Sequence, residues 1–344
     1  MGYNRSQKQM KKTLLLALAT LFATVTFAQQ QLATLNHNDS ISVFYGANAL
    51  VQAHAAAIHG DVITLSSGTF NSATITKEIT IRGNGMMRDN IAGTDPTVIN
   101  ELHINIPDDS TFVFGLEAVE VLNTLYYTNG VSPTFSKCQI NRLDRESQWS
   151  SCSLQNATFI NCVINRIEYL TSGAQFFNSI VKSLTSYSNI SFRNCIVKLA
   201  RMFSTSASNG LNFYNCILID NESGYANTIS SSSTICHYCI GIYYGSLSGG
   251  YFHNNNDDYH NTNYGSLSSV FKYFNGSNYT GFDFDLQDSV ATNVLGNDST
   301  QVGVYGGMVP FNPRVNTPRY VRANVAPHTT LDGKLSVDIE VVSE

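Results

Sequence analysis

The middle of the chain repeats a short pattern of hydrophobic and polar positions, Phe-x-Asn-Cys-x-Ile/Val, with substitutions. Copies begin at residues 135, 159, 176, 192 and 213, and a weaker copy spans 236–240. The position held by cysteine recurs at 138, 162, 179, 195, 216 and 239, a mean step of about 20 residues, which is the length of one coil in a solenoid. The β-branched and aromatic content favours strands, and the consensus of leucine-rich repeats, which share this period, is absent.

Side-chain alternation within the motif predicts a bend in every coil. If the phenylalanine points inward, strict alternation places the cysteine outward, yet the cysteine and the Ile or Val after it form a second apolar series. The chain must therefore turn between them. Asparagine tolerates the left-handed backbone conformation and bonds its own backbone, so it suits a sharp turn between two short strands.

This motif resembles that of right-handed parallel β-helices of the pectate-lyase-like superfamily. The resemblance implies an all-β, single-stranded right-handed parallel β-helix with three strands per coil, an N-terminal capping helix and a C-terminal capping strand region. It also implies an internal ladder of stacked turn asparagines, here Asn161, Asn178, Asn194 and Asn215, from which Lys137 and Tyr238 depart at the ends. The fold is not specific for activity, because it hosts enzymes, adhesins and scaffolds alike.

Both ends of the chain agree with a capped solenoid. Residues 47–59 are rich in alanine, with Leu50, Val51, Ala55 and Ile58 expected on one helix face and Gly60 as the stop. Such a helix covers the open first coil. Residues 303–310 resemble a Gly-x-Tyr-Gly-Gly-x-x-Pro segment that closes bacterial surface β-helices. Residues 333–341 alternate in the manner of an edge strand.

The residue after each cysteine position should face outward, which places Val163, Ile180, Ile196 and Ile217 in one apolar strip. A continuous strip of this kind indicates a cover. We expect the tail, residues 317–344, to pack on or cap the solenoid of residues 29–316.

The first 28 residues predict export. Lysines at 11 and 12 precede an apolar stretch from Thr13 to Phe27, and the small residue Ala28 ends it. This is the pattern of a cleaved signal peptide, so the mature chain should begin near Gln29 and reach the periplasm, the outer surface or the medium. No later apolar run approaches the length of a membrane span. A net charge of -5 with dispersed basic residues argues against a nucleic-acid partner.

Cysteine chemistry is open at this level. In successive coils Cys138, Cys162, Cys195 and Cys216 would lie inside as small apolar side chains. Disulfides and metal binding are alternatives, but in-register side chains match disulfide geometry poorly. The pair Cys236 and Cys239 has no second pair to complete a zinc site, and we expect no resident metal.

Only 13% of the residues are charged, so a charged cluster that recurs on neighbouring coils is informative. It contains Arg142, Asp144, Arg145, Glu146, Arg166, Glu168, Lys182, Lys198, Arg201, Asp220 and Glu222. Polysaccharide lyases on this fold need carboxylates that hold Ca²⁺ and a basic residue that takes a proton, and glycoside hydrolases need paired carboxylates. Alternating signs are also what an ordinary salt-bridged surface gives, which is our preferred interpretation.

Aromatic residues recur seven to eleven residues after the cysteine position, at Trp149, Tyr169, Tyr187, Phe203 and Tyr225. Exposed, they would form a stacking platform for sugar rings; buried, they would fill the core.

Two hypotheses about function follow. We favour an exported, non-catalytic β-helix that binds a polysaccharide or a cell-surface glycan, or has a structural role. The alternative is a polysaccharide lyase or glycoside hydrolase that uses the charged cluster on an acidic polysaccharide, and only this alternative calls for Ca²⁺.

Overall fold

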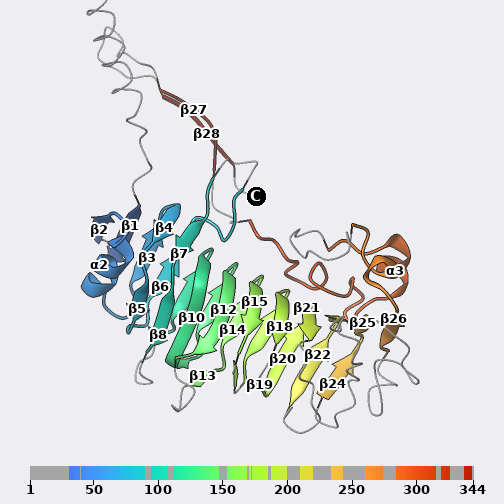
Figure 1. Cartoon of the computed structure of the whole chain (residues 1–344). Coiled ribbons are helices and arrows are strands. Elements are labelled where there is room, and N and C mark those ends of the chain that lie inside the picture. The colour runs from blue at the N-terminus through green and yellow to red at the C-terminus, as the bar shows by residue number, and fades with distance from the viewer. Residues whose placement is uncertain are drawn as a thin grey trace, which may run out of the picture. The chain divides into compact units, whose positions relative to one another are not determined.

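The computed structural model describes residues 31–38, 40–89, 94–106, 112–146, 153–168, 170–171, 173–184, 187–199, 210–219, 234–242, 260–273, 284–314, 319–325 and 337–342. Most of the described strands stack side by side in two long sheets (Figure 1), called sheet A and sheet B here. Within the repeats, each motif places one strand in sheet A and the next in sheet B. The fold is a parallel β-helix, as the repeat predicts.

Sheet A has eleven described strands. Their order is β2 (Ser40–Tyr45), β1 (Leu32–His37), β3 (Val62–Leu65), β6 (Thr80–Arg82), β9 (Gly115–Glu117), β11 (Thr134–Ser136), β14 (Thr158–Ile160), β17 (Gln175–Phe177), β20 (Ile190–Arg193), β22 (Leu211–Tyr214) and β24 (Thr234–His237). Strand β1 pairs antiparallel with β2 and β3, and the later pairs are parallel.

Sheet B has thirteen described strands. Its main path runs through β26 (Thr262–Tyr264), β25 (Ile240–Ile242), β23 (Ile217–Ile219), β21 (Ile196–Leu199), β18 (Ile180–Leu184), β15 (Val163–Ile167), β12 (Gln139–Arg145), β10 (Glu120–Val131), β7 (Thr97–Ile99) and β4 (Gly68–Phe70). Strands β5 (Ala73–Ile75), β8 (Leu102–Asn105) and β13 (Ser153–Gln155) join beside this path.

The remaining elements are short. Strands β16 (Leu170–Thr171) and β19 (Tyr187–Ser188) pair in parallel and supply a third strand in two coils. Strands β27 (Arg319–Val325) and β28 (Val337–Val342) form a separate antiparallel pair, so the alternating tail does contain a strand. The described helices are α2 (Ala49–Ala56), α3 (Asp288–Asn293) and the 3₁₀ helix η2 (Leu267–Ser269).

The motif phenylalanines point inward and stack along the solenoid. Phe135, Phe159, Phe176, Phe192 and Phe213 are in register on adjacent rungs and fully buried. Successive ring centroids lie 4.6, 4.5, 4.7 and 5.0 Å apart. These separations follow the spacing of strands in a sheet, ~4.8 Å. In the last copy, Cys236 takes the phenylalanine position opposite Phe213.

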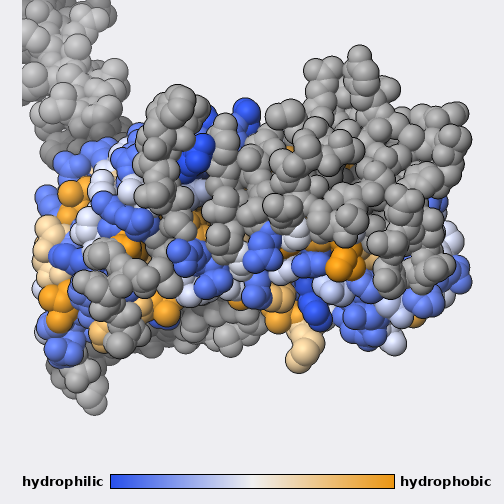
Figure 2. Space-filling model, turned by 90° about the horizontal axis from the view of Figure 1, so that it is seen from below, coloured by the Kyte–Doolittle hydropathy of each residue, from blue (hydrophilic) through white to orange (hydrophobic). Residues whose placement is uncertain are grey.

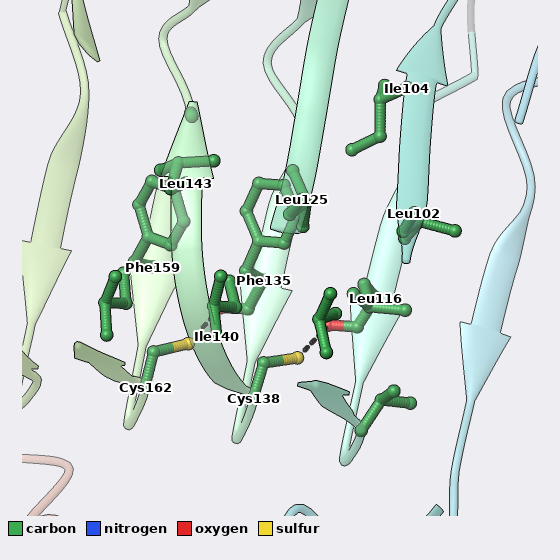
Figure 3. Close-up of a cluster of buried hydrophobic side chains, with 14 of the residues drawn as sticks. Leu102, Ile104, Leu116, Leu125, Phe135, Cys138, Ile140, Leu143, Phe159 and Cys162 are labelled. Atoms are coloured by element: carbon green, nitrogen blue, oxygen red, sulfur yellow. Dashed lines mark hydrogen bonds between the residues drawn. The ribbon is translucent and has the colours of Figure 1, made fainter. Parts of the chain in front are cut away.

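The cysteines of the motif lie inside beside this stack, as Figure 3 shows for Cys138 and Cys162. The thiol of Cys138 donates to the carbonyl oxygen of Leu116 at 3.2 Å, and that of Cys162 donates to Phe135 at 3.4 Å. The six described cysteines, at 138, 162, 195, 216, 236 and 239, are free and buried. The prediction of packed free thiols is confirmed for them, and Cys152 lies outside the described residues.

The predicted bend is present in each copy of the motif. Lys137, Asn161, Asn178, Asn194, Asn215 and Tyr238 all have left-handed backbones, with φ between 45° and 55°. Each lies between a strand of sheet A and the next strand of sheet B. The turn position therefore selects asparagine for its backbone conformation.

The turn asparagines, which the resemblance implies form an internal ladder, are buried at equivalent positions of successive coils, and three of them also bond to a distant part of the chain. Asn161, Asn178 and Asn215 bond through their side chains to a later segment, residues 284–314, which we call the strap. Asn215 exchanges two hydrogen bonds of 3.0 Å with Asn297, and Asn178 donates to the carbonyls of Val304 and Gly306. Further contacts join Asn161 to Asn312 and Lys137 to Arg314. The strap thus runs back along the turns, and Lys137 belongs to the same row of contacts.

The strap also covers the predicted apolar strip. Val163, Ile180, Ile196 and Ile217 are at most 2% exposed and share a cluster with the strap residues Val302, Val304 and Phe311. This cluster is separate from the core inside the coils. The strip is covered as expected, but by residues 284–314, which precede the tail that we expected to cover it.

Glycines let the strap approach the turns closely. A Cβ atom on Gly303, whose φ is 88°, would lie 2.7 Å from the side chain of Ile217. On Gly306, it would lie 2.9 Å from the side-chain nitrogen of the turn residue Asn194, and 1.7 Å from the backbone oxygen of Gln301 within the strap. The glycine-rich segment 303–310 therefore lies along the side of the solenoid, where a side chain at Gly303 or Gly306 would collide with its neighbours.

The predicted capping helix exists, but its buried face differs from the expected one. Helix α2 buries Ala49, Leu50 and Ala53 in the core inside the coils. Val51, Ala55 and Ile58, which we placed on that face, are exposed, Val51 by 41% and Ile58 by 53%, and Ile58 follows the end of the helix. At this N-terminal edge, strand β2 also exposes Ile41, Val43 and Tyr45, and hydrophobic residues are visible at that end in Figure 2.

Candidate functional site

The charged residues that the sequence singles out meet on the outer face of sheet B. Leu125, Leu143 and Ile167 are in register and point into the core. The residues that flank them therefore point outward, which puts Asp144 and Glu168 in one column and Arg142 and Arg166 in another. We call these four residues the sheet B cluster.

An arginine joins the two carboxylates of the cluster. The Nη2 atom of Arg142 donates to Asp144 at 2.7 Å and also to Glu168. Glu168 receives a second ion pair from the Nε atom of Arg166, and Asp144 accepts the backbone N–H of Arg145 at 2.8 Å. Asp144 and Glu168 are only 7% and 8% exposed. Both carboxylates are therefore largely buried and bonded to cationic donors.

The pKa values of two residues of the cluster, Asp144 and Arg142, are shifted. Burial raises the pKa of Asp144, although the N–H of Arg145 and the charge of Arg142 act in the opposite direction. For Arg142, burial acts to lower the pKa, but the hydrogen bonds and charges of Glu168 and Asp144 outweigh it and leave the pKa raised. Arg142 is thus a permanent cation held between two carboxylates.

Two residues that the sequence analysis missed extend the charged face. His103 and Tyr126 precede Asp144 in the same column, and their ring centroids are 4.9 Å apart. His103 contacts Glu101 at 3.0 Å and Glu146 at 3.5 Å. Glu146 also accepts a hydrogen bond from Thr128, so it belongs to this neighbouring group rather than to the sheet B cluster.

Exposed asparagines form a further feature of this face. The side chain of Asn123 donates to Asn100 at 2.8 Å, and that of Asn165 donates to Asn141 at 3.1 Å. Asn100 in turn donates to Ser72. Each pair joins neighbouring rungs, and amides of this kind present both donors and acceptors to solvent. We call Asn100, Asn123, Asn141 and Asn165 the outer amide column.

The other predicted site residues are only partly placed. Lys182 lies on β18, where burial lowers its pKa, and Lys198 lies on β21 opposite Ile219. The ion pairs of the sheet B cluster join Arg142 and Arg166 to its two carboxylates. The structure describes only the backbone of Tyr187, in β19. Outside the described residues lie Trp149, Tyr169, Arg201, Phe203, Asp220, Glu222 and Tyr225.

The described part of the chain offers no arrangement of three or more His, Cys, Asp or Glu residues suited to a metal ion. None of its helices has the length and apolar character needed to cross a membrane. Comparison with known proteins gave no family model, no curated protein and no solved structure that matches this chain.

Proposed function

We propose that this chain is an exported, non-catalytic β-helix whose outer sheet faces bind carbohydrate. The observation that carries the proposal is the position of Arg142, which bonds at the same time to Asp144 and Glu168. General acid or base catalysis needs a carboxyl group that exchanges its proton with the substrate. Both carboxylates instead accept hydrogen bonds from cations that do not titrate near neutral pH.

The same contact disfavours the catalytic alternative. In glycoside hydrolases two carboxylates flank the bond to be cleaved, and the sugar ring occupies the space between them. Here a guanidinium group lies between the two carboxylates. A lyase needs carboxylates whose charge is available to Ca²⁺, but each carboxylate of the sheet B cluster is already paired with arginine.

The outer face of sheet B has the side-chain chemistry of a carbohydrate-binding surface. Sugars present closely spaced hydroxyl groups, which both donate and accept hydrogen bonds, and side-chain amides match them in this respect. The outer amide column repeats such groups on successive rungs, beside Arg142 and Arg166. The signal sequence would deliver this surface to the compartment where polysaccharides are found. We also propose that the chain belongs to the pectate-lyase-like superfamily, because its Phe-x-Asn-Cys-x-Ile/Val repeat resembles the motif of those proteins.

The test uses the mature chain, residues 29–344, with a panel of acidic and neutral polysaccharides in the presence of Ca²⁺. Release of unsaturated products and of reducing ends is measured first, and binding is measured afterwards. We expect binding without turnover. Replacement of Asn123 and Asn165 by alanine should weaken binding, whereas Asn293→Ala, an exposed asparagine on α3, should leave it unchanged.

Turnover that disappears in Asp144→Asn or Glu168→Gln would establish the enzyme and overturn the proposal. Absence of binding across the whole panel would also contradict it. Sequencing of the N-terminus of the exported protein checks the expected start near Gln29.

A further inference from the structure

Strand β2 leaves one edge of sheet A open. It is the first strand in the order of the sheet, so among the described residues only β1 pairs with it (Figure 1). Every residue of β2 is exposed except Phe44, which is partly buried and packs against the core inside the coils. Ile41, Val43 and Tyr45 share the outer face and are 69%, 43% and 59% exposed.

The open edge of β2 carries unpaired backbone groups. In an antiparallel ladder, pairs of residues that exchange both backbone hydrogen bonds alternate with pairs that exchange none. The N–H of Gly46 donates to the carbonyl of Gln31 at 2.8 Å, and this pair continues the register of β1 and β2. Ile41, Val43 and Tyr45 lie an odd number of residues from Gly46, so their N–H and C=O groups point away from β1. Such a row of donors and acceptors is a template for another strand.

The sequence does not protect this edge. Soluble proteins commonly guard an exposed edge strand with lysine, proline, an inward-pointing charge or a bulge. Residues 40–60, which contain β2 and α2, include no Asp, Glu, Lys, Arg or Pro, and the register of β1 and β2 has no bulge. On α2, burial and the charge of Lys77 lower the pKa of His54 to about 4, so this side chain is neutral at pH 7. A second copy therefore meets no formal charge like its own at this edge.

The edge is complementary to itself. When Val43 of one copy lies opposite Val43 of a second copy on a two-fold axis, antiparallel pairing places Ile41 opposite Tyr45 in both halves. The residues whose backbone groups point away from β1 then pair with one another along the strand. A β-branched residue opposite an aromatic one is a favourable cross-strand pair. After the expected cleavage near Gln29, only residues 29 and 30 precede the described chain, too few to form a strand along β2.

We propose that two copies of the chain associate through β2, which pairs antiparallel with β2 of the second copy and joins the two sheets A into one continuous sheet. Each copy uses its open edge once, so the assembly closes as a dimer. The pairing brings the exposed Ile41, Val43 and Tyr45 into contact with their counterparts. This inference goes beyond the proposed function and does not depend on it, because the sheet B cluster and the outer amide column lie on the other sheet.

The first test measures the mass of the mature chain, residues 29–344, by sedimentation velocity over a range of concentrations. We expect a dimer that dissociates on dilution. Val43→Lys and Val43→Glu each place two equal charges opposite one another, and each should weaken the dimer by about tenfold or more. An equimolar mixture of the two variants should restore it, because lysine then lies opposite glutamate. The matched control is Gln175→Lys, at an exposed position of β17 inside sheet A, which should dimerise as the wild type does.

The second test is hydrogen exchange, which locates the contact. In the wild type, the backbone amides of residues 40–45 should exchange more slowly at concentrations that favour the dimer than after dilution. In Val43→Lys they should exchange at one rate under both conditions. The wild-type measurement needs no variant, so it tests the inference even where a substitution at Val43 prevents folding, which far-UV circular dichroism detects.

Four results would overturn the inference. The wild type is monomeric at every concentration, or a dimer persists in both Val43 variants. In the third, the dimer forms while hydrogen exchange in residues 40–45 is unchanged, which places the contact elsewhere. In the fourth, the two variants remain monomeric when mixed, which contradicts the two-fold pairing at Val43. All four leave the proposed carbohydrate binding standing, because the polysaccharide panel measures it separately.

Discussion

The side-chain amide of Asn178 donates to the backbone carbonyl of Gly306 at 2.7 Å, across a separation of 128 residues. A second bond from the same nitrogen reaches Val304 at 2.9 Å. All of these groups are buried, and the backbone of Asn178 is left-handed. The turn residue therefore has two tasks, because it bends the coil and holds the strap.

These two tasks can be separated by mutation. Asn178→Gly keeps the left-handed backbone without strain but removes both hydrogen bonds. The buried carbonyl of Gly306 loses its donor, whereas that of Val304 still accepts the backbone N–H of Phe311. We expect the free energy of unfolding to fall by about 2 kcal/mol or more, measured by urea titration of the mature chain. Asn141→Gly, in the exposed outer amide column, should cost less than half as much. Equal losses at the two sites would show that the strap contact contributes no special stability.

A tight backbone contact within the strap, between Gly306 and Gln301, predicts a strong effect at Gly306. A methyl group there meets the backbone oxygen of Gln301 at 1.7 Å, which a side-chain movement does not relieve. We expect Gly306→Ala to destabilise the protein by about 3 kcal/mol and to expose the apolar strip, detected as increased binding of a hydrophobic dye. Gly265→Ala is the control, because a Cβ atom there has no neighbour within 4 Å. Dye binding equal to that of the control would be evidence against the strap as the cover.

Three of the cysteine positions should resist thiol reagents in the folded state. Burial raises the pKa of Cys138, Cys195 and Cys239, which removes the reactive thiolate. We expect these thiols to react with a disulfide reagent only after denaturation. A denatured, unreduced sample should then show at least six free thiols, the number that the structure describes. Fewer than five would contradict the packed-thiol interpretation.

Serine should replace cysteine at one of these positions with little loss. Ser179 already occupies the equivalent position in its coil and donates to the carbonyl of Phe177 at 2.8 Å. The thiol of Cys195 donates to Arg193 in the same way. We expect Cys195→Ser to change the free energy of unfolding by less than about 1.5 kcal/mol. Cys195→Leu, which overfills the coil, should cost more; a leucine variant as stable as the serine variant would show that the position is loosely packed.

His54 on helix α2 makes stability depend on pH. Burial, together with the charge of Lys77, lowers its pKa from 6.5 to about 4. The unfolded chain therefore takes up a proton below pH 6.5 that the folded chain does not accept until about pH 4. The contribution of this group is complete above pH 6.5 and declines as the pH falls towards 4. In His54→Gln the unfolding free energy should fall less steeply over this interval, and an unchanged slope would contradict the assignment.

The coiled fold could be predicted because the same local pattern recurs in each turn. Phe159, Asn161 and Cys162 are the inward phenylalanine, the turn residue and the buried cysteine of one copy, and the other copies have equivalent positions. The alternation of side chains along the chain is enough to require the bend between the two strands. The strap is a different case. Asn215 and Asn297 are 82 residues apart, and no repeat relates them. Val302 and Val304 occupy alternate positions, and so do the apolar residues of the tail. The apolar strip that contains Val163 therefore predicted a cover without showing which of these two segments supplies it.

The charged face was predictable for the same reason. Arg142, Asp144, Arg166 and Glu168 follow their cysteines at matching distances, so register brings them together. His103 and Tyr126 were missed because they precede the first copy of the motif. The outward residues that follow the inward phenylalanines were missed although they stand in the motif itself, at the position treated as variable. Its content becomes informative only when strand register places Arg193 beside Tyr214.

The direction of the strap has a consequence for the order in which the chain folds. Each coil of the repeat can add to the one before it as the chain emerges. Along its sequence, the strap contacts the turn at residue 215 first and the turn at residue 137 last. The five turns at residues 137, 161, 178, 194 and 215 must therefore be formed before the strap can pack along all of them. Until residues 284–314 arrive, Val163, Ile180, Ile196 and Ile217 face water. A chain that lacks the strap therefore presents an apolar flank, which favours association with other chains.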